Sequence, residues 1–165
     1  MKYFFPFAIL AFTAQPAFAD VSVRFVESAP KDRFVISTDC AVTDLAITID
    51  LSQSNGSLIF DVTSEGAGVE VFQPVEVQTG TASITQVLDG DQTLGLTIDA
   101  LSEGADVIIS ADLDDVLTNS SLGQIRVSGS ELDGATIVLA IAGQSQRATF
   151  ENGSNRVSFP QGCIS

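Results

Sequence analysis

Apolar and polar residues alternate one by one along four segments of this 165-residue chain. Such alternation places apolar side chains on one face of an extended strand, as an antiparallel strand with one buried face requires. Valine, isoleucine and threonine, which favour strands, are frequent in these segments. The pattern therefore predicts an all-β protein. The alternating apolar positions are Val21, Val23 and Phe25; Leu45, Ile47, Ile49 and Leu51; Leu94, Leu96 and Ile98; and Val107, Ile109, Ala111 and Leu113.

Turn sequences separate the predicted strands at short intervals. Asn55-Gly56 and Asn152-Gly153 are candidate type I′ hairpin turns, because both central residues of that turn need a positive φ. The region 138–159 is expected to form three consecutive strands, with the Asn152-Gly153 turn joining the last two.

The number of short strands, ten or eleven, favours a two-sheet antiparallel β-sandwich, either immunoglobulin-like or jelly-roll-like. Only residues 114–122 are expected to hold a short helix. Six residues are predicted to lie in the core: Ile47, Ile49, Phe60, Leu96, Ile98 and Ile109.

The N-terminus has the three regions of a secretory signal peptide. A positive charge at Lys2 precedes an apolar run over 3–12, and Ala17-Phe18-Ala19 has the small-x-small pattern of a cleavage site. We expect residues 1–19 to be removed and 20–165 to form a single exported domain, periplasmic or extracellular. No later apolar run approaches the roughly 18 residues of a membrane span, so no membrane insertion is expected.

The acidic composition restricts the partners of the chain. After removal of Lys2, six basic and 21 acidic residues leave a formal charge of −15. This charge repels nucleic acid and anionic lipid, and it favours cations, above all Ca²⁺, or basic protein surfaces. A surface that is acidic only for solubility is the alternative interpretation.

The residue types that are missing argue against an enzyme. The chain has no histidine, which excludes Ser-His-Asp and Cys-His arrangements and imidazole-based zinc sites. A Ser-Lys nucleophile would need Lys31, which is flanked by charged residues and expected to be solvated. A carboxylate pair stays open, although the predicted mature chain has no tryptophan or tyrosine to form a sugar-binding platform. We therefore predict no catalytic residues.

Two cysteines, Cys40 and Cys163, remain after the predicted cleavage. An even number of cysteines in an exported chain predicts one disulfide, here between the loop after the second strand and the C-terminus. Two unpaired buried thiols are the alternative.

A group of three aspartates, Asp112, Asp114 and Asp115, is the candidate metal site. Asp112 and Asp114 are two residues apart on a predicted strand, so their carboxylates project from the same face, and Asp115 follows where the strand ends. Ca²⁺ accepts oxygen ligands in such a loose arrangement. A solvated, aspartate-rich strand end is the alternative, and Asp89-Gly90-Asp91 is interpreted as an ordinary turn.

Several segments together resemble small exported bacterial proteins grouped as "aggregation factor core" proteins, named after the core protein of the sponge aggregation factor. The resemblance implies an adhesion-related β-domain that binds a protein or glycan surface, with Ca²⁺-dependent self-association. No catalytic pattern comes with it. The segments that carry it are 20–25, 29–34, 49–52, 58–61, 66–74 and 112–115.

Three classes of function therefore stand as hypotheses. The first is an adhesion module assisted by Ca²⁺, and the second is an accessory domain that binds a protein or peptide without metal. The third, an enzyme that uses carboxylates, is the one that the composition opposes.

Overall fold

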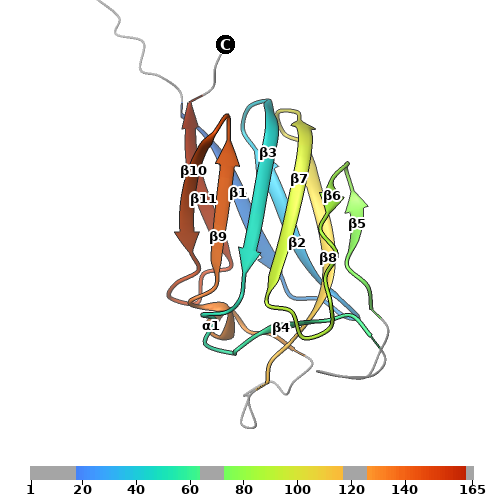
Figure 1. Cartoon of the computed structure of the whole chain (residues 1–165). Coiled ribbons are helices and arrows are strands. Elements are labelled where there is room, and N and C mark those ends of the chain that lie inside the picture. The colour runs from blue at the N-terminus through green and yellow to red at the C-terminus, as the bar shows by residue number, and fades with distance from the viewer. Residues whose placement is uncertain (1–17, 64–72, 117–125, 163–165) are drawn as a thin grey trace, which may run out of the picture.

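The chain folds into two antiparallel β-sheets, which face each other in the computed structural model (Figure 1). The structure describes residues 18–63, 73–116 and 126–162. This arrangement confirms the predicted two-sheet antiparallel β-sandwich.

The first sheet has the strand order β11-β1-β2-β8-β4, and β5 also pairs with β8. The β8 strand therefore has neighbours on both sides: β2 lies along one of its edges, and β5 and β4 follow each other along the other edge. The strands of this sheet are β1 (Phe18–Val26), β2 (Asp32–Thr38), β4 (Ile59–Asp61), β5 (Glu76–Thr79), β8 (Asp106–Asp114) and β11 (Arg156–Gly162).

The second sheet has the strand order β10-β9-β3-β7-β6. Its strands are β3 (Val42–Asp50), β6 (Ser83–Ile84), β7 (Thr93–Leu101), β9 (Thr136–Ile141) and β10 (Gln144–Thr149).

The core lies between the two sheets and is built from the alternating apolar positions. Ile47 and Ile49 of β3 pack with their neighbours on β7, and the intervening Thr48 is only half-buried. All six residues predicted to lie in the core are buried: Ile47, Ile49, Phe60, Leu96, Ile98 and Ile109. The alternation along these strands therefore identified the inward face correctly.

The predicted meander over 138–159 is only partly correct. β9 and β10 form a hairpin whose turn residues Ala142 and Gly143 have φ of 50° and 78°. β11, however, pairs with β1 in the other sheet, so Asn152-Gly153 connects the two sheets rather than two neighbouring strands. Both turn residues do have the positive φ expected from their sequence, 59° and 70°.

The Asn55-Gly56 prediction of a type I′ hairpin is wrong. In this turn only the following residue, Ser57, has a positive φ, 50°. The flanking strands β3 and β4 belong to different sheets, so no hairpin forms here.

A short helix, α1 (Gly129–Leu132), was not predicted, whereas the region 114–122 expected to hold one begins with the end of β8. The remainder of that region, from residue 117 on, lies outside the described residues. Ser128 caps α1 by accepting a hydrogen bond from the Glu131 amide, and the Glu131 carboxylate accepts one from the Ser128 amide. This Ser-x-x-Glu capping box is a recognisable helix-start signal in the sequence.

The predicted cleavage site and the predicted disulfide both involve the ends of the chain, which the structure describes only in part. Residues 1–17 lie outside the described part, and β1 begins at Phe18, where Phe18 and Ala19 pair with Gly162 and Gln161. Cys163 also lies outside it, so the Cys40–Cys163 bridge stays a prediction. The C-terminal ends of β2 and β11 do lie at the same end of the first sheet, on either side of the start of β1.

No helix in the part of the chain that the structure describes is long and apolar enough to cross a membrane.

Candidate metal centre

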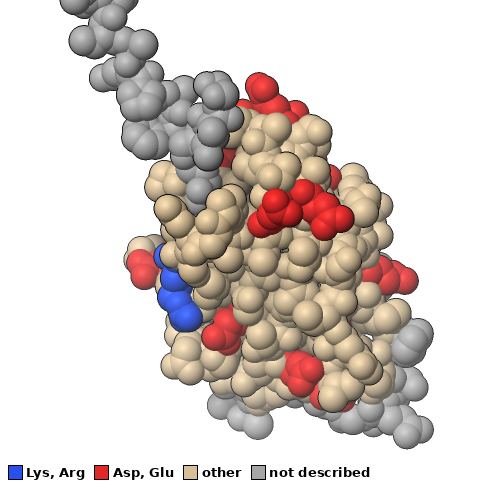
Figure 2. All heavy atoms as spheres, turned by 45° about the horizontal axis from the view of Figure 1, so that its top comes forward, with Lys and Arg blue, Asp and Glu red and all other residues tan. Residues whose placement is uncertain are grey.

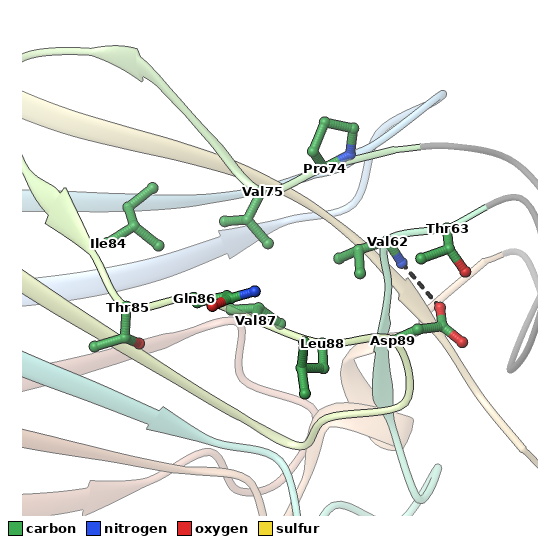
Figure 3. A pocket seen from close by; sticks show the side chains of 10 residues that line it. All are labelled: Val62, Thr63, Pro74, Val75, Ile84, Thr85, Gln86, Val87, Leu88 and Asp89. Carbon is green, nitrogen blue, oxygen red and sulfur yellow. Dashed lines mark hydrogen bonds between the residues drawn. The ribbon is translucent and has the colours of Figure 1, made fainter.

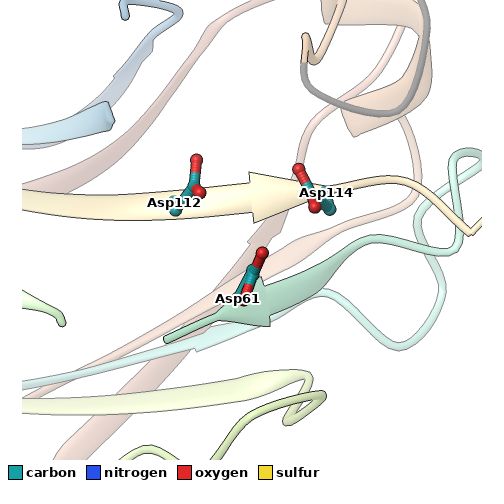
Figure 4. Close-up of side chains that lie close together, drawn as sticks. All are labelled: Asp61, Asp112 and Asp114. Carbon is teal, nitrogen blue, oxygen red and sulfur yellow. The ribbon is translucent and has the colours of Figure 1, made fainter. Parts of the chain in front are cut away.

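Strand register brings three aspartates together on the outer face of the first sheet. On β8, Asp112 and Asp114 alternate with the core residues Ala111 and Leu113, so they point away from the core. The short β4 pairs with this part of β8, and Asp61 lies directly opposite Asp112. Residues that face each other across an antiparallel pair project to the same side, so Asp61 joins the two β8 aspartates (Figure 4).

We call this group of Asp61, Asp112 and Asp114 the aspartate cluster. One carboxylate oxygen from each residue lies within 4.8 Å of the others. The side chains are buried: Asp61 and Asp114 are 0% exposed and Asp112 is 7% exposed. A solvated strand end, the alternative interpretation of the sequence, does not describe these buried carboxylates.

The hydrogen bonds around the cluster are unevenly distributed. The Gln73 side-chain amide donates to Oδ2 of Asp112 over 2.6 Å. Both carboxylate oxygens of Asp61 are buried, and no N–H or hydroxyl group of a described residue donates to them. The group that lies beside them is the Asp89 carboxyl. A buried polar group without a partner costs roughly 1–3 kcal/mol, and a charged one costs more. The Asp61 carboxylate therefore needs either a proton or a cation in the folded protein.

The cluster raises the pKa of its own members. The pKa of Asp61 rises to about 7, first because it is buried, then because of the neighbouring Asp89 carboxyl and the charges of Asp114 and Asp112. The pKa of Asp112 rises to about 6, because of burial and the charge of Asp114, while Lys31 opposes the shift. Both shifts express the cost of gathering negative charge in a buried place.

A fourth buried carboxylate, Asp32, lies at the start of β2 and is 5% exposed. Its pKa rises to about 7, mainly through burial, although the hydrogen bond from the Ser28 amide, 3.0 Å long, lowers it. The charge of Asp112 contributes to the rise, so Asp32 is coupled electrostatically to the cluster.

The nearest lysine does not neutralise the cluster by direct contact. The Lys31 ammonium forms an ion pair with Glu76 at 2.6 Å and donates to the Pro74 carbonyl oxygen at 2.8 Å. Among the described residues, neither Asp61 nor Asp112 forms an ion pair. Three clustered carboxylate groups supply the hard oxygen ligands that Ca²⁺ prefers, from two strands that are hydrogen-bonded to each other.

Two of the three predicted ligands, Asp112 and Asp114, are members of the cluster. Asp115 is buried but is not part of the group, because it follows the last residue of β8 and leaves the alternation that aligns the other two. Asp61 was missed. It lies on a strand of three residues and reaches the cluster only through pairing with a distant segment, which no local pattern reveals.

The residues of the 89–91 turn have the backbone roles expected of turn aspartates. Asp91 accepts a hydrogen bond from the Leu88 amide over 2.7 Å, and Asp89 accepts one from the Val62 amide over 3.2 Å. The second contact also attaches the turn to the residue that follows Asp61, and the Asp89 carboxyl raises the Asp61 pKa through a side-chain hydrogen bond and through its charge.

Acidic side chains extend well beyond the cluster. On the face shown in Figure 2 they form several separate groups, whereas basic side chains appear only at one margin. This distribution agrees with the net charge of −14 for the full chain.

Comparison of the chain with protein-family models, with curated proteins and with solved structures found no match.

Proposed function

We propose that this chain is a Ca²⁺-binding β-sandwich module that works outside the cytoplasm in adhesion or aggregation. The observation that carries the metal part of the proposal is Asp61, a fully buried carboxylate to which no described N–H or hydroxyl group donates and which lies close to two further aspartates. A divalent cation at this place would pair with all three carboxylates and offset the electrostatic cost of gathering them.

The ligand chemistry favours Ca²⁺ over other common cations. The cluster offers oxygen atoms only, whereas zinc sites are built from cysteine and histidine with fewer carboxylates. Mg²⁺ demands near-ideal octahedral geometry and usually keeps several waters, whereas Ca²⁺ accepts six to eight oxygen ligands in irregular arrangements. Further ligands would come from bound water or nearby carbonyl groups.

The adhesion part of the proposal rests on the resemblance to the aggregation factor core proteins and on the predicted export. An acidic surface is suited to cation-bridged contact with a protein or glycan surface, including a second copy of the chain. No catalytic role is proposed, because the chain has no histidine.

Thermal unfolding with and without calcium tests the metal site. If Ca²⁺ binds only the folded state, the stability gain at one hundred times Kd is about 2.7 kcal/mol, which raises Tm by several degrees. Asp114→Asn should remove this gain, and Asp99→Asn, on the exposed face of β7, should keep it. An equal gain from sodium at matched ionic strength would mean that screening, and not a site, stabilises the protein.

The second candidate, a domain that binds a peptide without metal, is favoured by a separate apolar pocket. If the protein binds a peptide without metal, calcium should not change its Tm. Peptide binding to the pocket can be measured separately from calcium binding.

A further inference from the structure

An apolar pocket opens beside the segment that leads into β5 of the first sheet and the segment that follows β6 of the second sheet (Figure 3). Its volume is about 450 Å³, within the range of pockets that bind small molecules or side chains of a partner. Asp89 lies at one end and Ile84 at the other (Figure 3). Six apolar residues line it: Val62, Pro74, Val75, Ile84, Val87 and Leu88.

The pocket leaves apolar surface open to solvent. Leu88 is 59% exposed, and it is one of two large hydrophobic side chains that are exposed in the described part of the chain. The other, Val116, is 51% exposed and does not line the pocket. Apolar surface that is gathered in a concave site, rather than scattered singly, is typical of a binding site.

The strands beside the pocket also have unused backbone edges. Among the described strands, β5 pairs only with β8, and β6 pairs only with β7. An open sheet edge can accept an extended peptide, whose main chain adds to the sheet while alternate side chains enter pockets. Because β5 and β6 have only four and two residues, the pocket and its charge would supply much of the affinity.

The charge around the pocket indicates what such a peptide carries. Asp89 is the only charged residue among the described side chains that line the pocket. The single lysine near β5, Lys31, is already paired with Glu76. A lysine or arginine on the ligand would be attracted to the Asp89 carboxylate, and an acidic ligand would be repelled.

We propose that this pocket binds an extended segment of a partner protein in which apolar residues alternate with lysine or arginine. One apolar side chain enters the pocket beside Leu88, and a basic side chain lies toward Asp89. The proposal does not depend on the metal site, and it assigns the protein-binding surface that the second candidate function requires.

The test uses a short blocked peptide of alternating valine and lysine that carries one tryptophan. Because the protein has no tryptophan, the anisotropy of the peptide's fluorescence reports binding without interference. The titration is made in the presence of a chelator, so that failure of the metal site cannot affect it. Two further peptides, with glutamate replacing lysine or serine replacing valine, separate the contributions of charge and apolar surface.

We expect saturable binding of the valine–lysine peptide and weak or no binding of the other two. Leu88→Ser should weaken binding about tenfold, from the loss of one apolar contact, whereas Val116→Ser should leave it unchanged. Asp89→Asn, which keeps an oxygen to accept the Val62 amide, should weaken binding of the lysine peptide, and Asp99→Asn should have a much smaller effect.

Absence of saturable binding would overturn the proposal. Equal binding of the serine peptide would also overturn it, because attraction to the acidic surface alone would then explain the signal. Equal effects of Leu88→Ser and Val116→Ser would place the contact outside the pocket. Far-ultraviolet circular dichroism of each variant checks that the fold is intact.

Discussion

Lowering the pH from about 8 to about 5, with a chelator present, should stabilise this protein, contrary to the usual effect of acid. Asp32 is the best group for a quantitative prediction, because it is buried and its pKa rises from 3.8 to about 7 on folding. A carboxyl group whose pKa is raised by folding binds its proton more tightly in the folded state. The folded state is therefore favoured at low pH, and this advantage is lost as the pH rises through the folded-state pKa.

The size of the effect follows from the two pKa values. A difference of about 3 units corresponds to about 4 kcal/mol at pH values well above 7, at 1.36 kcal/mol per unit. Between about pH 5 and about pH 8, the change in proton binding by Asp32 alone amounts to roughly 2–3 kcal/mol. Asp61 and Asp112 act in the same direction, but their contributions are not additive, because the carboxylates repel one another.

This pH interval contains few competing titrations. The chain has no histidine, and the pKa of Asp50 is lowered by hydrogen bonds from Ser52, so its contribution is lost only at pH values below this interval. Urea unfolding, followed by far-ultraviolet circular dichroism at a series of pH values, measures the free energy of unfolding.

Variants separate Asp32 from the other acidic groups. Asp32→Asn retains an acceptor for the Ser28 amide and should reduce the pH dependence by about 2–3 kcal/mol, whereas Asp99→Asn should leave it unchanged. A free energy of unfolding that falls between about pH 8 and about pH 5 would show that the buried aspartates are stabilised as anions, and would refute the reasoning.

Three further predictions concern processing, the disulfide and the core. Export should remove residues 1–19, and an intact mass of the exported protein that still includes Ala19 would contradict this. Cys40 and Cys163 should resist alkylation until a reductant is added, and Cys163→Ser should lower stability by about 2–4 kcal/mol; two reactive thiols in the fresh protein would exclude the bridge. Ile49→Ala should lower stability by about 2–5 kcal/mol and Thr48→Ala by much less, as urea unfolding would show, because only Ile49 is fully buried.

The fold class could be predicted from local patterns, because a half-buried strand shows its buried face in its own sequence. Ile47, Leu96 and Ile98 are examples: each alternates with more exposed neighbours and each lies in the core. Sheet membership could not be predicted in the same way. The Asn152-Gly153 turn has the backbone conformation that its sequence favours, yet the strand after it pairs with β1, and that choice depends on packing across the whole sandwich.

The candidate site, like the fold, was predicted only where the residues are neighbours on one strand. Asp112 and Asp114 are neighbours on one strand, so period-two geometry alone places them on one face. Asp61 joins them through pairing between segments about fifty residues apart in sequence, and its strand is too short for alternation to be recognised. Asp115 was predicted to turn toward the other two from the loop after the strand, but it is not a member of the cluster.

The most direct test of the metal site is calorimetric titration of the mature protein with Ca²⁺ at neutral pH. The proposed site predicts saturable binding, with Kd in the range of about 10⁻⁴–10⁻³ M that extracellular calcium modules show. Binding should be lost in Asp61→Asn and kept in Asp99→Asn. No saturable binding by the wild-type protein, or equal binding by Asp61→Asn, would contradict a calcium site at the aspartate cluster.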